Sequence, residues 1–211
     1  MAVIPFYGSD RPDLFAIERA AMDRPGRVIA ELNRRLPGGR VLDVGAGDGF
    51  TAAALTTDVR SVVPLEPAFG MVDPARGLRW VRGEAEHLPF ADATFDAGYA
   101  TWAYFFSREW DPTPGLAGLH RVVRPGGPLL IVDNLGDDEV SALTDRDITA
   151  DPTFWESHGF DTIEVLTSFE FANIDEARTL LGFYFGERGQ REARVSLSYR
   201  VGIFVGTSAG G

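Results

Sequence analysis

A glycine-rich turn between a short apolar run and a helical segment constrains the fold of this chain more than any other feature. Residues 40–44, Arg-Val-Leu-Asp-Val, have the composition of a buried strand, and glycines follow at positions 45, 47 and 49. Helical spacing of apolar residues then continues through residues 51–55. Glycine permits positive φ angles and a close approach of the backbone to a ligand. The pattern predicts a β-loop-α unit whose turn faces a ligand.

The rest of the chain repeats this alternation of strands and helices, which indicates a parallel sheet with helices on both faces. We predict an α/β, Rossmann-like fold with a seven-stranded, mostly parallel sheet and an antiparallel C-terminal strand. Residues 134–152 show little apolar periodicity and are expected to form a loop or a short irregular helix. The strands are expected at 40–44, 61–65, 78–82, 95–100, 128–132, 160–171 and 195–205, and the helices within 14–36 (two, separated at Pro25) and at 51–55, 113–124 and 175–185.

Charge and composition restrict the partners. The formal net charge of −11 repels phosphate backbones and anionic lipid surfaces, so we expect a small neutral or cationic molecule, and neither nucleic acid nor membrane, as a partner. The sequence contains no cysteine, which excludes thiolate nucleophiles and cysteine-bound zinc and fits a cytoplasmic protein. It also contains no lysine, which excludes a Schiff-base or phosphate-loop lysine.

Acidic residues stand at the ends of the first three predicted strands. Asp43 can accept hydrogen bonds from an ammonium group or orient the glycine turn. Glu66 can accept both hydroxyls of a ribose. Glu84 can accept from the exocyclic amine of adenine, while the amide of Ala85 donates to a ring nitrogen. Together these groups suit a nucleoside that carries a positive charge.

The glycine spacing argues against a dinucleotide. The turn reads G-x-G-x-G, whereas the dinucleotide fingerprint is G-x-G-x-x-G, with the third glycine one residue later. Asp43 and Asp48 would in addition repel a pyrophosphate.

Five ordered motifs resemble class I S-adenosylmethionine-dependent methyltransferases, in particular those of ubiquinone and menaquinone biosynthesis with a type 11 methyltransferase domain. The motifs are residues 43–49, Glu66-Pro67, 84–90, Phe95-Asp96 and Arg121-Val122-Val123-Arg124-Pro125-Gly126-Gly127. The resemblance implies a Rossmann-like methyltransferase fold and S-adenosylmethionine as cofactor, with S-adenosylhomocysteine as product. It also implies the cofactor-binding residues, namely Asp43, Gly45, Ala46 and Gly47 at the methionine end, Glu66 at the ribose, Glu84 and Ala85 at the adenine, and Ala100 and Thr101 near the sulfonium.

By the same resemblance we expect a single domain over residues 1–211. It would comprise an N-terminal helical lid at 1–38, a cofactor-binding core at 40–135 and a C-terminal sheet edge at 136–211. Tyr7, from the lid segment, and Trp102 and Tyr104, after the predicted fourth strand, are candidates for an aromatic acceptor pocket, although a core role is open for each.

No residue is identified as a catalytic base. Methyl transfer from a sulfonium is an in-line displacement with a good leaving group, so positioning and desolvation can carry much of the rate. Where similar proteins show a histidine pair, this chain has Phe105-Phe106. Asp133-Asn134 resembles a magnesium position of catechol methyltransferases, but we interpret it as a solvated loop and expect no metal.

Two other functions stay open. A non-catalytic S-adenosylmethionine binder that acts as scaffold or sensor fits the absence of an evident base. A nicotinamide-dependent oxidoreductase on a related sheet is disfavoured by the glycine spacing and by the absence of lysine. The acceptor, the acceptor atom and the oligomeric state cannot be derived from the sequence.

Overall fold

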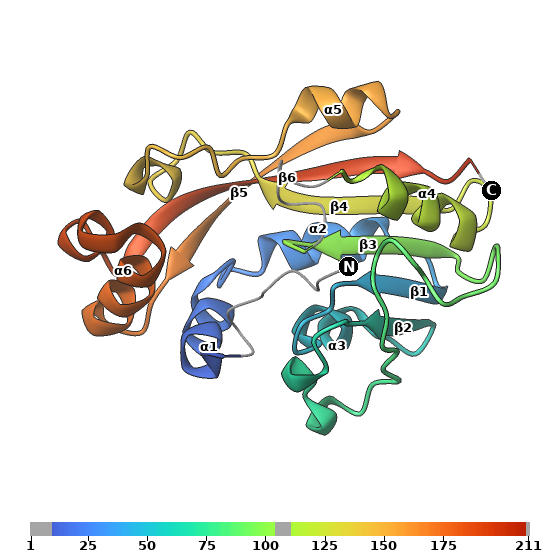
Figure 1. Ribbon diagram of the computed structural model, residues 1–211, viewed down its shortest axis with the longest axis horizontal. Helices are drawn as coiled ribbons and strands as arrows, with labels where there is room; N and C mark the ends of the chain where they lie inside the picture. The colour runs from blue at the N-terminus through green and yellow to red at the C-terminus, as the bar shows by residue number, and fades with distance from the viewer. Residues whose placement is uncertain (1–9, 104–110, 210–211) are drawn as a thin grey trace.

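The computed structural model describes residues 10–103 and 111–209, which are organised around a six-stranded sheet (Figure 1). Its strand order is β2-β1-β3-β4-β6-β5. The first four strands in this order are parallel, whereas β6 runs antiparallel to both of its neighbours. The prediction of a mostly parallel sheet with an antiparallel C-terminal strand is therefore confirmed. The strands are β1 (Gly39–Val44), β2 (Arg60–Leu65), β3 (Ala97–Thr101), β4 (Pro128–Asn134), β5 (Asp161–Glu170) and β6 (Ser196–Thr207).

The strand predicted at residues 78–82 is wrong. Only Val81 pairs with β2, through a single parallel bridge to Leu65. The amide of Val81 donates to the Pro64 carbonyl over 2.9 Å, and its carbonyl accepts from the Glu66 amide over 3.1 Å. The next ladder bond would need an N–H on Pro64, and proline has none. Pro64 therefore interrupts the ladder on the side of residue 79, and β2 is the last strand on this side of the sheet.

Helices cover the two faces of the sheet in separate apolar clusters. One cluster joins α1 (Pro12–Ala21), α2 (Arg27–Arg35), α3 (Phe50–Leu55) and α6 (Ile174–Arg191) to one face of the strands. The other joins α4 (Thr113–Val122) and α5 (Pro152–Ser157) to the opposite face. Successive residues of β1 alternate between the clusters, with Val41 in the first and Leu42 in the second. This confirms the expected helices on both faces.

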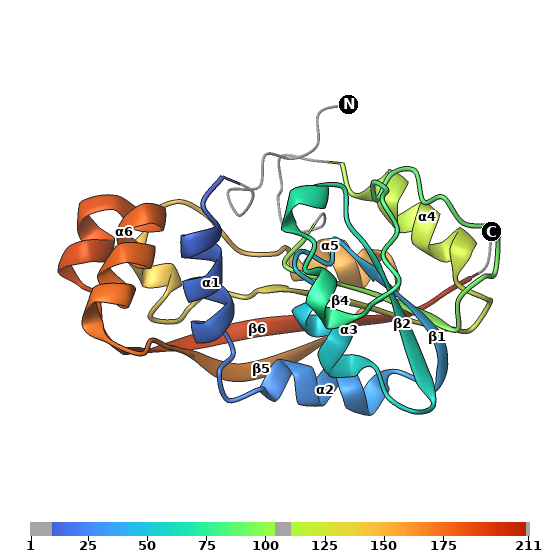
Figure 2. The same ribbon diagram turned by 90° about the horizontal axis from the view of Figure 1, so that it is seen from below.

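The helical predictions are confirmed, with one difference in length. Helix α6 continues past the predicted end at residue 185 to Arg191, across a kink at Gly186, which has φ of 60°. It packs beside α1 at the end of the sheet that β5 and β6 form (Figures 1 and 2). Between β4 and α5, residues 135–151 are irregular, as expected, apart from a single 3₁₀ turn. The short 3₁₀ helices are η2 (Phe69–Met71), η3 (Pro74–Arg76) and η5 (Ser141–Leu143).

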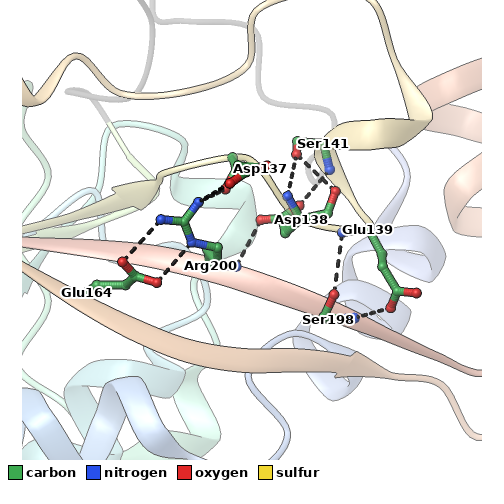
Figure 3. A network of polar contacts seen from close by, with 8 residues as sticks. Asp137, Asp138, Glu139, Ser141, Glu164, Ser198 and Arg200 are labelled. Atoms are coloured by element: carbon green, nitrogen blue, oxygen red, sulfur yellow. Dashed lines mark hydrogen bonds and ion pairs between the residues drawn. The ribbon is translucent and has the colours of Figure 1, made fainter.

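A network of ion pairs and hydrogen bonds fastens the segment after β4 to the surface of β6 and β5 (Figure 3). The Arg200 guanidinium donates from Nε and Nη2 to the two carboxylate oxygens of Glu164 over 2.9 and 3.1 Å. Its Nη1 reaches Asp137 over 3.1 Å, and its backbone N–H donates to the Asp138 carboxylate over 2.8 Å. The start of the long irregular segment is therefore held along β6.

The sequence reading predicts no membrane partner. In the described parts of the chain no helix has both the length and the apolar character that a membrane span requires.

Candidate functional site

The glycine turn connects β1 to α3 at the carboxyl end of the parallel strands. The amides of Gly45 and Ala46 both donate to the Leu65 carbonyl, over 2.9 and 3.0 Å, which fastens the turn to the end of β2. Gly49 precedes the first residue of α3 with φ of 78°. A Cβ atom at this position would lie 2.7 Å from the ring of Trp80 and 2.9 Å from Leu78. Only glycine fits here without displacing its neighbours.

Glu66 holds the same turn from the end of β2. Its two carboxylate oxygens accept hydrogen bonds from the amides of Gly47 and Ala68, each over 2.8 Å. The residue is 6% exposed, and burial raises the pKa of its carboxyl group. Each carboxylate oxygen has a second lone pair, so the bond to the loop leaves room for a ligand hydroxyl. The expected ribose contact of Glu66 stays a prediction.

Asp43 is buried completely at the end of β1. The hydroxyl of Tyr99, on the neighbouring strand β3, donates to its Oδ2 over 2.9 Å. Its Oδ1 has no hydrogen-bond partner among the residues that the structure describes. Burial raises the pKa of Asp43 to about 7, and the nearby charge of Glu66 acts in the same direction. An unpartnered buried carboxylate oxygen is costly unless a ligand completes it.

The predicted adenine-binding pair follows the Val81–Leu65 bridge. Gly83 packs so closely on Leu65 that a Cβ atom would lie 2.9 Å from its side chain. Glu84 closes a tight turn, because its carbonyl accepts from the His87 amide over 3.1 Å. This path brings Glu84 and the buried Ala85 to the carboxyl end of β2.

The end of β3 presents Thr101 and Trp102. The strand continues through Thr101, one residue beyond the predicted end at Ala100. Ala100 is 1% exposed and faces the α4 side of the sheet, whereas Thr101 is half-buried. Trp102 has φ of 45°, and its indole N–H donates to Asn134 over 3.1 Å. A positive φ in a residue other than glycine costs about 1–3 kcal/mol, so the surroundings must hold Trp102 in this conformation.

A cavity of about 300 Å³ lies between the N-terminal helices and the end of β3. This is the place where the sequence predicts the acceptor pocket, and Trp102 is among the lining residues. The other two candidates for the pocket, Tyr7 and Tyr104, lie outside the described residues. The cavity is lined by Arg19, Ala20, Met22, Asp23, Arg24, Gly26, Val28, Ile29, Leu32, Phe50, Thr51, Ala54, Thr101 and Trp102.

Sequence reasoning missed two arginines beside the glycine turn. Arg76 of η3 pairs with the Asp48 carboxylate over 2.6 Å, and its Nε donates to the Asp48 carbonyl over 2.7 Å. Arg19 of α1 lines the cavity, and both guanidinium groups lie over the ring of Phe50, at 5.0 Å for Arg19 and 5.6 Å for Arg76. The sequence carries no signal for either, because they stand 24 or more positions from Asp43 along the chain.

The interpretation of Asp133-Asn134 as a solvated loop is wrong. Both are the last residues of β4, and Asp133 is 1% exposed. Burial raises the pKa of Asp133 well above its usual range. Asn134 is occupied in the protein itself, since its Oδ1 accepts from Trp102 and its Nδ2 donates to the Ile148 carbonyl over 3.0 Å. Within residues 10–103 and 111–209, no group of three or more candidate ligands could hold a metal ion.

Comparisons with known proteins agree with this geometry. Residues 42–131 match the methyltransferase domain family. This part of the chain therefore resembles a methyltransferase domain. A demethylmenaquinone methyltransferase from Beutenbergia cavernae is 39% identical over 101 residues, which cover 46% of this chain and 41% of that protein. The match thus spans less than half the length of the curated relative.

Solved structures confirm the class I methyltransferase fold. A SAM-dependent methyltransferase from Thermotoga maritima superposes with a TM-score of 0.62 at 17% identity, covering 94% of each chain. The [4+2]-cyclase SpnF superposes with a TM-score of 0.56 at 18% identity, covering 90% of this chain and 82% of the cyclase. At these identities the likeness concerns the fold alone.

S-adenosylmethionine is the cofactor of class I methyltransferase domains, and the residues at the carboxyl ends of β1 and β2 fit it. The cofactor carries a sulfonium and an ammonium group, and this site offers the unpartnered Oδ1 of Asp43 beside the buried carboxylate of Glu66. Gly47 has φ of 57°, and among the described residues a Cβ atom there would touch only the ends of the Phe15 and Met71 side chains, at 3.6 and 3.8 Å. A Cβ atom at Gly47 would therefore meet two side-chain ends and no backbone atoms of another described segment.

Proposed function

We propose that this protein transfers the methyl group of S-adenosylmethionine to a small-molecule acceptor. One observation carries the proposal: the glycine turn stands between two buried carboxylates, and Asp43 presents an oxygen that no described residue satisfies. A buried charge of this kind is retained where a ligand supplies its partner. A cationic nucleoside is the ligand that the surrounding acids and the match to the methyltransferase domain family favour.

Each part of the methyl donor is recognised by a different acidic residue: Asp43, Glu66 or Glu84. We assign the ammonium group to Asp43, the ribose hydroxyls to Glu66, and the adenine to Glu84 together with the amide of Ala85. Gly45, Ala46 and Gly47 keep the backbone close to the methionine end, since the turn is fixed by bonds to Leu65 and Glu66. These assignments extend the sequence prediction.

Reactivity in this proposal comes from positioning. When bound, S-adenosylmethionine supplies a methyl group on a sulfonium, which is a good leaving group. Thr101 and Trp102 border the cavity beside β3, so they are placed to orient an acceptor and to exclude water from it. The aromatic rings of Trp102 and Phe50 in the lining favour an acceptor with a flat, apolar part. We assign no general base.

Calorimetry with S-adenosylhomocysteine, followed by transfer of a labelled methyl group to a panel of phenols, quinones and amines, tests the proposal. We expect micromolar binding of S-adenosylhomocysteine and label in at least one acceptor class. Binding without label in any class would instead favour the non-catalytic binder. Failure to bind S-adenosylhomocysteine at millimolar concentration, together with binding of NADH, would overturn the proposal. The turnover experiment is essential, because the fold also occurs in a protein described as a cyclase.

A further inference from the structure

The cavity beside β3 contains a positive charge that the described residues do not neutralise. The Nε of Arg19 is buried and makes no hydrogen bond to any residue in 10–103 or 111–209. No ion pair of Arg19 is found within the same ranges, whereas the sequence as a whole has a net charge of −11. Among the described residues, Arg19 therefore has no ion-pair partner, although the protein is strongly acidic.

Aromatic rings hold the Arg19 guanidinium in place without compensating its charge. Its central carbon lies 5.0 Å from the ring centre of Phe50 and 6.0 Å from that of Phe15. Such contacts attract a cation and fix its orientation, but the ring carries no net charge. The donor groups of Arg19 are thus positioned, and they stay available for an anion.

The acids nearest to the cavity are already engaged. Asp23, which lines it, accepts from the amides of Arg27 and Val28 over 3.0 and 2.9 Å and from the hydroxyl of Thr167 over 2.6 Å. That carboxylate caps the start of α2 and connects it to β5. Its role is structural, so it does not serve as the counter-ion of Arg19.

Two further acids lie near the glycine turn. Asp48 is paired with Arg76 over 2.6 Å. Asp43 and Arg19 attract each other, but no ion pair joins them, and burial raises the pKa of Asp43 to about 7 and so disfavours the charged form of this carboxyl group. An uncompensated positive charge on Arg19 therefore remains.

Apart from its charged residues, the cavity is mostly apolar, and it adjoins the glycine turn at Phe50 and Thr51. Met22, Val28, Ile29, Leu32 and Ala54 contribute to the lining, together with the ring of Trp102. Residues 45–49 and Glu66 do not belong to the lining. The volume of about 300 Å³ is at the lower end of small-molecule sites. A ligand with an anionic end and an apolar body matches this cavity better than the zwitterionic methionine end of the donor does.

We propose that this cavity is the acceptor site and that the acceptor is a small organic acid, whose carboxylate binds Arg19 and whose apolar, ring-sized body lies between α2 and Trp102. The inference rests on the proposed function. The carboxylate is the anchor, and another atom of the acceptor attacks the methyl carbon. As that bond forms, the carbon–sulfur bond breaks with its electron pair going to sulfur, and the proton of the attacking atom passes to solvent.

The test compares an acid with its neutral amide. The full chain, saturated with S-adenosylhomocysteine, is titrated by calorimetry with 4-hydroxybenzoate and with 4-hydroxybenzamide. We expect the acid to bind at least about tenfold more tightly than the amide, in line with a charge-assisted hydrogen bond. Arg19→Met should abolish this preference. Arg24→Met is the matched control, because it removes the same charge from an exposed residue of the same lining and should keep the preference.

A second arm separates the acceptor from the donor. The affinities of Arg19→Met for S-adenosylhomocysteine and for 5′-methylthioadenosine, which lacks the amino-acid end, are compared with those of the wild type. We expect both to be unchanged. Weaker binding of S-adenosylhomocysteine alone would assign Arg19 to the donor's carboxylate and overturn the inference. Should Arg19→Met fail to fold, Arg19→Lys replaces it in the titrations. We expect the ratio of its affinity for 4-hydroxybenzoate to its affinity for 4-hydroxybenzamide to be several-fold lower than in the wild type.

The two proposals fail in different ways. If the wild type binds S-adenosylhomocysteine but has equal affinities for 4-hydroxybenzoate and 4-hydroxybenzamide, the inference of an acidic acceptor is wrong and the proposed function stands. If the wild type does not bind S-adenosylhomocysteine, the proposed function is wrong.

Discussion

Charged side chains are buried in one region of the molecule and exposed in another. The first region is the carboxyl ends of β1 and β2, and the second is the outer surface of β5 and β6. At the first region, Asp43 is fully buried, one of its oxygens has no partner among the described residues, and Glu66 is 6% exposed. At the second, the Arg200 guanidinium pairs with Glu164 and Asp137, whose side chains are 43% and 97% exposed (Figure 3). The first region buries a carboxylate oxygen without a hydrogen-bond partner among the described residues, and the second forms ion pairs that are exposed to water.

This difference separates binding groups from framework groups. Exposed ion pairs contribute little to stability, because solvent screens them. An uncompensated buried charge costs several kcal/mol, and a protein retains it where a ligand completes the site. Charge alone therefore does not identify a site in this chain, whereas charge with burial and a missing partner does. The same criterion marks Arg19 beside the cavity and Asp133 at the end of β4.

The largest effect is expected at the glycine turn. Gly49→Ala should lower the free energy of unfolding by about 2–5 kcal/mol, because it adds backbone strain at a positive φ to a clash with Trp80 and Leu78. Urea denaturation measures this. Gly126→Ala is the control, since Gly126 has a similar φ of 77° but open space around it, and we expect about 1–2 kcal/mol there. Equal losses in the two variants would show that close packing around the turn is unimportant.

Asp43 should make stability depend on pH in an unusual direction. Its folded pKa of about 7 lies above the ordinary 3.8, so folding favours the protonated form. The resulting stabilisation is complete below about pH 4 and is lost as the pH rises through about 7, a change of about 2–4 kcal/mol. Asp43→Asn should remove this component. The difference in free energy of unfolding between wild type and variant, measured from pH 4.5 to 8, should therefore change steadily, and a constant difference would contradict the raised pKa.

Glu66 should affect ligand binding more than an exposed glutamate does. Glu66→Gln replaces one carboxylate oxygen with an NH₂ group, which cannot accept a hydrogen bond. One of the backbone amides of Gly47 and Ala68 therefore loses its acceptor. We expect the binding of S-adenosylhomocysteine to weaken by about 1–3 kcal/mol, measured by calorimetry. Glu164→Gln is the matched control in the exposed network and should leave the affinity unchanged. Unchanged affinity in Glu66→Gln would remove this residue from the site.

The smallest effect is expected in the exposed network itself. Arg200→Met removes the ion pairs to Glu164 and Asp137, yet solvent already screens these pairs. We expect little change in Tm and none in the affinity for S-adenosylhomocysteine. A loss of stability comparable to that of Gly49→Ala would show that the network is a main support of the fold, and the contrast between the two regions would then fail.

Local patterns were enough to predict the fold and to place Asp43 and Glu66 at strand ends, while their contacts with the cofactor stay predictions. The glycine turn, Asp43 and Glu66 are encoded within short segments, because a strand end and a tight turn depend on neighbouring residues. The strand expected at residues 78–82 fails for a non-local reason, since its pairing is limited by the missing N–H of Pro64 on the adjacent strand.

Side-chain roles that depend on packing could not be predicted. The sequence pattern predicts a solvated Asp133, but the folded chain buries it at the end of β4, which lies between β3 and β6 in the sheet. Arg19 belongs to an ordinary amphipathic helix, and its role beside Phe50 and the cavity arises because α1 folds back onto the turn. Such long-range contacts have no signature in the spacing of residues.

The most direct test of the central claim is the uptake or release of protons when S-adenosylhomocysteine binds near pH 7. Calorimetric titrations in buffers with different ionisation enthalpies measure this quantity. Because the ligand's ammonium group favours the ionised form of Asp43, wild type and Glu164→Gln should each release up to about half a proton on binding, and Asp43→Asn should release none. If wild type and Asp43→Asn bind with equal affinity and equal proton exchange, the buried carboxylate does not receive the cationic end of the donor.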